Sequence, residues 1–127
     1  MTRWLLIFLG GGLGATLRYA VTGWTQRLWG VSFPWGTLAV NLLGCAGIGF
    51  MAALLTGPVL IREEYRFAVI IGLLGGFTTF SSYCWETISL TNNAQWGFAL
   101  GNILASNVLG LACAWAAARL TMKFYGV

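Results

Sequence analysis

The segment that decides the fold is residues 67–90, FAVIIGLLGGFTTFSSYCWETISL, an apolar stretch long enough to cross a bilayer as a helix. Its middle, GGFTTFSS at residues 75–82, combines two glycines with poor helix formers, several of which carry hydroxyls that compete for the backbone. A membrane tolerates an unwound backbone only where the freed polar groups face protein, water or an ion. The segment therefore predicts a spanning helix broken near the bilayer midplane, where channels and transporters place ion sites.

Similar apolar stretches surround this segment, so the sequence predicts four transmembrane helices, at about 4–24, 35–55, 67–90 and 96–118. Between them lie the helix breakers Gly30, Pro34, Gly57 and Pro58. Of the 127 residues 58% are hydrophobic and 8% are charged, whereas charged residues make up about a quarter of a soluble domain. The chain is therefore predicted to be a single all-α membrane domain over residues 1–127, embedded in lipid.

The composition also excludes whole classes of function. The net charge of +4 comes from scattered cations without a basic cluster, so no nucleic acid is expected as a partner. There is no histidine, and the three acids are Glu63, Glu64 and Glu86. The three cysteines stand far apart without metal-site spacing. With so few reactive side chains, the protein is not expected to be an enzyme.

The charges and small residues predict orientation and packing. The cations gather on the side of both termini, which favours cytoplasmic termini; they are Arg3, Arg62, Arg66, Arg119 and Lys123, against Arg27 on the other side. Small residues at every fourth position predict close contacts between helices. The three rows are Gly10 and Gly14 followed by Arg18 on the first helix, Cys45, Gly49 and Ala53 on the second, and Gly97, Gly101 and Ala105 on the fourth. Four helices are too few to enclose a water-lined path, so a homo-oligomer, most simply a homodimer, is expected.

Several polar side chains fall inside the predicted spans, where they are costly and mark either interhelical hydrogen bonds or a pathway. Thr37 and Asn41 are one turn apart on the second helix; on the fourth, Asn102 and Ser106 are one turn apart and Asn107 is adjacent. Arg18 either extends to the membrane surface or lends positive potential to an anion vestibule. Phe80 and Tyr83 share one face after the break, beside a polar stripe of Thr79, Ser82 and Glu86.

Three motifs carry a family resemblance: GGFTTFS at residues 75–81, GGGLGA at 10–15 before Arg18-Tyr19, and GTLAVNLLG at 36–44. In these motifs the sequence resembles the Fluc (CrcB) family of bacterial fluoride channels. The resemblance implies a dual-topology homodimer of antiparallel subunits in the bacterial plasma (inner) membrane, which exports toxic cytoplasmic fluoride passively. It also implies a structural sodium ion, Na+, at the dimer interface, held by the carbonyls of Gly75 and Thr78.

The resemblance further implies two fluoride pathways per dimer. The candidate residues of these pathways in this chain are Phe80, Tyr83, Asn41, Ser81, Ser82 and Glu86. Thr37 and Arg18 are added as candidates because they are polar and lie inside the predicted spans. Tyr83 departs from the family, which has a second phenylalanine there. Amide, hydroxyl and aromatic ring-edge donors suit a small, strongly hydrated anion. A carboxylate suits it poorly, so Glu86 is either protonated or orders its neighbours.

Two other functions compete with this prediction. A proton-coupled exporter of the small multidrug-resistance type is also a dimer of four-helix chains, but it needs a carboxylate in the first helix, where this chain has Arg18. A purely structural subunit would not need a broken helix. Liposome efflux separates passive fluoride flow from proton-driven antiport or no transport.

Overall fold

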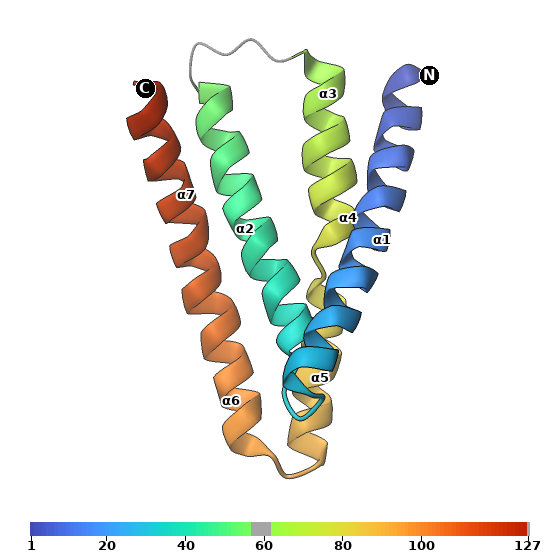
Figure 1. Ribbon diagram of the computed structural model, residues 1–127, viewed down its shortest axis with the longest axis vertical. Helices are drawn as coiled ribbons and strands as arrows, with labels where there is room; N and C mark the ends of the chain where they lie inside the picture. The colour runs from blue at the N-terminus through green and yellow to red at the C-terminus, as the bar shows by residue number, and fades with distance from the viewer. Residues whose placement is uncertain (57–61, 127) are drawn as a thin grey trace.

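The computed structural model describes residues 1–56 and 62–126 as long helices joined by short links (Figure 1). Helix α1 is Thr2–Trp29 and α2 is Trp35–Thr56. The third long helical segment contains α3 (Glu63–Phe67), the π-helical η1 (Ala68–Leu74), α4 (Gly75–Phe77) and α5 (Phe80–Asn92), and the fourth contains α6 (Trp96–Leu104), the π-helical η2 (Ala105–Leu109) and α7 (Gly110–Tyr125). All four segments are long and apolar enough to cross a membrane, which confirms the predicted helical membrane architecture.

The helices extend beyond the predicted bounds. α1 continues past residue 24 to Trp29 and stops at Gly30, whose φ of 80° lies in the region that glycine adopts most easily. The third segment spans 63–92 instead of 67–90, and the fourth continues past residue 118 to Tyr125. Hydropathy marks only the apolar part of a helix, whereas polar turns continue its hydrogen bonding beyond that part. The predicted breakers Gly57 and Pro58 lie outside the described residues.

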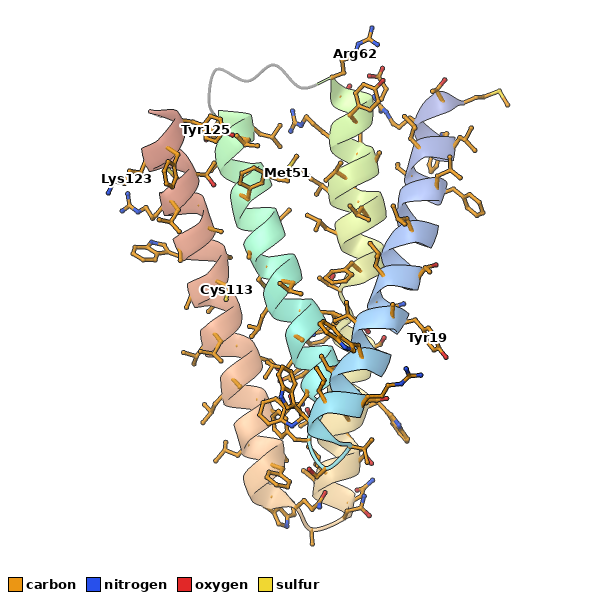
Figure 2. The ribbon with its side chains drawn as sticks, in the orientation of Figure 1. Tyr19, Met51, Arg62, Cys113, Lys123 and Tyr125 are labelled. Carbon is orange, nitrogen blue, oxygen red and sulfur yellow. The ribbon has the colours of Figure 1, made fainter. Side chains whose placement is uncertain are left out.

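Both termini lie at one end of the molecule, together with the last turn of α2 and the first turn of α3 (Figure 1). Arg62 and Lys123 lie at this end, whereas Tyr19 points outward from the middle of α1 (Figure 2). Arg3 and Glu63 form an exposed ion pair here, with 2.9 Å between Nη2 and Oε2. An exposed pair of this kind contributes little to stability. Because Arg62 and Lys123 lie at the end that carries both termini (Figure 2), the cations of the two segments gather there, as the charge distribution of the sequence predicts.

Close helix contacts occur at two of the predicted rows of small residues. Gly10 and Gly14 of α1 lie directly against the backbone of η1 and α4, and Gly76 in turn lies against the backbone of Gly11. Gly49 brings α2 onto the backbone of α7 at Ala114, and these two helices pack along much of their length. By contrast, a side chain added at Gly97 would meet no atom within 4 Å among the described residues. At Gly101, the next residue of that row, an added side chain would meet only the Phe33 ring, at 3.9 Å.

The surface is far more apolar than that of a soluble protein. Large apolar side chains such as Trp4 and Phe8 are 78% and 76% exposed. Polar side chains such as Thr37, Thr79 and Asn102 are buried, alongside apolar ones such as Val40. An apolar surface with polar groups kept inside is the arrangement that suits a protein surrounded by lipid.

Candidate functional site

The helical backbone is interrupted between α4 and α5. Thr78 (φ −83°, ψ 160°) and Thr79 (φ −151°, ψ 116°) are both extended. Helix α5 starts again at Phe80 with Thr79 as its N-cap, whose Oγ1 accepts a hydrogen bond from the Ser82 N–H at 3.2 Å. The interruption thus brings the carbonyl end of α4 and the N–H end of α5 to one place.

Side chains from two other helices bind three of the backbone groups that the interruption frees. Asn41 of α2 pairs with Thr79 twice: its Nδ2 donates to the Thr79 carbonyl at 3.0 Å, and its Oδ1 accepts from the Thr79 N–H at 2.8 Å. Arg18 of α1 donates from Nη1 to the Thr78 carbonyl at 3.3 Å. These contacts replace helical hydrogen bonds, so the extended backbone is partnered without water.

A cavity of about 390 Å³ lies beside the interruption and is lined from α2, η1, α4, α5 and η2. It brings together three of the predicted pathway residues, Asn41, Phe80 and Tyr83, with both residues of the predicted sodium site, Gly75 and Thr78. The Phe80 and Tyr83 rings pack at an angle of 41° with their centroids 5.5 Å apart. We call this space the aromatic cavity.

A second cavity, of about 370 Å³, lies near the link between α1 and α2 and contains Thr37 and Glu86. Thr37 Oγ1 donates to Glu86 Oε1 at 2.7 Å. The other carboxylate oxygen, Oε2, is buried and has no hydrogen-bond partner among the described residues. We call this space the polar cavity, since most of its lining residues carry polar groups; they include Thr22, Gln26, Ser32, Ser89, Asn93 and Gln95.

The predicted polar stripe of Thr79, Ser82 and Glu86 is divided by these contacts. Thr79 Oγ1 donates to Ser82 Oγ at 2.9 Å and lies 3.4 Å from Ser81 Oγ, so these hydroxyls cluster in the first turn of α5. Glu86 instead contacts Thr37. Phe80 and Tyr83 therefore share one cavity, whereas Thr37 and Glu86 share the other.

The polar residues of the fourth helical segment have different roles. Asn102 is fully buried and donates from Nδ2 to Thr87 Oγ1 at 2.9 Å, which is the interhelical bond expected as one alternative. Ser106 and Asn107 instead line the aromatic cavity, which the predicted pathway did not include. In the sequence these two residues are recognisable only as adjacent polar residues in an apolar span. The sequence does not show that both lie in η2, where the wider π-helical turn makes the directions of consecutive side chains differ less than in an α-helix.

Comparison with known proteins gives one consistent result over most of the chain. The family model for "CrcB-like protein, Camphor Resistance (CrcB)" matches residues 5–118. Among curated relatives, a "Fluoride-specific ion channel FluC" of Opitutus terrae is 44% identical over 91% of this chain and 89% of that protein. Proteins of the same name from Chloroflexus aurantiacus (41% identical; 87% of this chain, 88% of that protein) and Rhizobium etli (44%; 90% of each) are similarly close.

Proposed function

This chain belongs to the CrcB family, and from that membership we propose that it is a fluoride-selective channel, not an enzyme, which passively carries fluoride out of the cytoplasm across the bacterial inner membrane. The observation that carries the proposal is the aromatic cavity, where Asn41, Phe80 and Tyr83 meet beside the interrupted helix. The interruption is proposed to lie near mid-membrane depth, between the two ends of its spanning segment. The negative membrane potential would drive the anion outward.

The donors at this cavity suit fluoride. Asn41 gives one Nδ2 hydrogen to Thr79 and has a second available, because an amide nitrogen carries two. The first turn of α5 adds the partial positive charge of a helix N-terminus. The edges of Phe80 and Tyr83 add positive ring rims without a full charge. Together these groups replace water around the anion but bind it weakly enough to release it.

The remaining candidate residues extend this pathway in the proposal. Thr37 and Glu86 line the polar cavity, and the Ser81 and Ser82 hydroxyls lie at the first turn of α5. Glu86 orders Thr37 by accepting its hydroxyl hydrogen. Arg18, bound to the Thr78 carbonyl, adds positive potential on the α1 side of the interruption.

Fluoride efflux from liposomes tests the function directly. Liposomes loaded with potassium fluoride and containing the purified protein should release fluoride when valinomycin lets potassium follow, whereas chloride-loaded liposomes should release almost no anion. No fluoride release, or equal release of both anions, would overturn the proposal. Efflux that requires a proton gradient and an organic cation would favour the multidrug exporter, for which α1 carries no acidic residue.

The exposure of the aromatic cavity supports an antiparallel homodimer. Phe80 is 76% exposed in a single chain, and the Asn41, Thr78 and Ser106 polar groups line the same cavity. Polar groups at membrane depth are rarely left to lipid, so we propose that an inverted second copy covers this face. Single-cysteine variants without Cys45, Cys84 and Cys113 should cross-link between opposite ends of the two subunits in membranes. Exclusively parallel cross-links would contradict the antiparallel dimer.

The carbonyls at the interruption fit a sodium ion shared between two copies. The Thr79 N–H bonds Asn41, so the Gly75 carbonyl loses the donor it would have in a continuous helix. The Thr78 carbonyl accepts from Arg18 and has a second lone pair. The residues described in 1–56 and 62–126 contain no cluster of three acidic, histidine or cysteine side chains for a metal, and backbone carbonyl oxygens are ligands that suit a hard cation. We propose that Gly75 and Thr78 of both copies hold structural Na+.

Sodium removal should therefore lower fluoride efflux and shift the purified protein from dimer toward monomer. N-methylglucamine replaces sodium at the same ionic strength. In the matched control sodium is then added back, which should restore both the efflux and the dimer. Unchanged efflux and an unchanged dimer after thorough removal would contradict a structural role for the ion.

A further inference from the structure

Tyr83 has a polar partner that a phenylalanine at this position could not use. Asn107 Nδ2 lies 3.4 Å from Tyr83 Oη and donates to the Ile103 carbonyl at 2.8 Å. Both residues line the aromatic cavity, Tyr83 from α5 and Asn107 from η2. The contact therefore joins the two helical segments at the aromatic cavity, which Asn41 and Thr79 also line.

The direction of this hydrogen bond follows from its second partner. The Ile103 carbonyl can only accept, so the amide must turn its NH₂ group, and not its oxygen, toward Ile103. The same nitrogen then presents its second hydrogen to Tyr83 Oη, which must act as the acceptor. The Tyr83 hydroxyl hydrogen is not used in this bond and can be donated elsewhere.

We propose that Asn107 is a positioning residue that fixes the Tyr83 hydroxyl as an additional fluoride donor in the aromatic cavity. This inference rests on the proposed function and adds a binding contact to it. The phenol accepts from Asn107 and donates its own hydrogen to the anion, and Asn41, with its available Nδ2 hydrogen, lines the same cavity. The site holds fluoride more tightly than an all-phenylalanine pathway, and the anion leaves it more slowly.

A double-mutant cycle tests the inference. The parent, Tyr83→Phe, Asn107→Leu and the double variant are purified in detergent and titrated with sodium fluoride by calorimetry. Tyr83→Phe should weaken fluoride binding about tenfold, as expected for the loss of one hydrogen bond to a charged group. Asn107→Leu should also weaken binding, by no more than that factor, because it frees the hydroxyl without removing it. The double variant should bind no more weakly than Tyr83→Phe, because Asn107 acts only through the hydroxyl. Asn92→Leu, an exposed asparagine in the last turn of α5, is the control and should bind as the parent does.

The outcomes separate this inference from the proposed function. Unchanged binding in Asn107→Leu, absence of binding by the parent, or losses that multiply in the double variant would each overturn it. Liposome efflux should be faster for Tyr83→Phe than for the parent, because the anion leaves the weaker site more quickly. A parent that binds fluoride with the expected cycle but does not conduct it would refute the channel function and leave the paired site standing.

Discussion

Phe80→Ile should reduce fluoride efflux to the rate of protein-free liposomes while the dimer forms normally. Isoleucine keeps most of the apolar bulk but removes the positive rim of the aromatic ring, which is the feature that can face an anion. The side chain is 76% exposed within the chain, so the substitution should disturb intrachain packing very little. A fluoride electrode measures the efflux, and size-exclusion chromatography reports the dimer.

The control for this substitution is Phe8→Ile. Phe8 is also 76% exposed, but it lies on α1 and does not line the aromatic cavity. This variant should conduct like the parent. Normal conduction by Phe80→Ile would show that the ring pair only packs, and the pathway would then have to lie elsewhere.

Asn41→Leu should abolish fluoride efflux and also lower the stability of the protein by about 2–6 kcal/mol. The change leaves the Thr79 N–H and carbonyl without their partner, and each unpaired buried backbone group costs about 1–3 kcal/mol. The same variant removes an amide donor from the aromatic cavity. Tryptophan fluorescence during unfolding of the purified protein measures the stability, and liposome efflux measures transport.

Asn92→Leu serves as the matched control for Asn41→Leu, because Asn92 is exposed at the end of α5. It should change neither stability nor efflux appreciably. Parent-like stability of Asn41→Leu would contradict the structural part of the prediction, and parent-like efflux would contradict the part that concerns fluoride.

The sequence predicts the long apolar helices well and the ends of those helices poorly. A window of apolar residues identifies each spanning segment, but α1 and α7 continue through polar turns that hydropathy does not detect. The stretch at 75–82 contains the residues at which helical dihedrals stop, Thr78 and Thr79. That this stretch lies at mid-membrane depth is part of the proposed function.

The candidate site could be predicted only in part, because its geometry depends on distances between helices. Spacing along one helix places Phe80 beside Tyr83, and the structure shows that contact. Spacing does not show that Thr37 binds Glu86 in a separate cavity, nor that Asn41 uses both ends of its amide on Thr79. Nor does it predict a π-helical turn, which turns Ser106 and Asn107 toward the same cavity.

The glycine contacts between α1 and the interrupted segment limit how far η1 and α4 can move relative to α1. Gly10, Gly14 and Gly76 bring backbone against backbone, with no layer of rotatable side chains between. Such a contact has no rotamers through which it can yield, and the backbone atoms already touch. α1 and the part of the third segment before the interruption should therefore move as one unit. In mechanical terms, α1 is a brace for the extended backbone at Thr78 and Thr79.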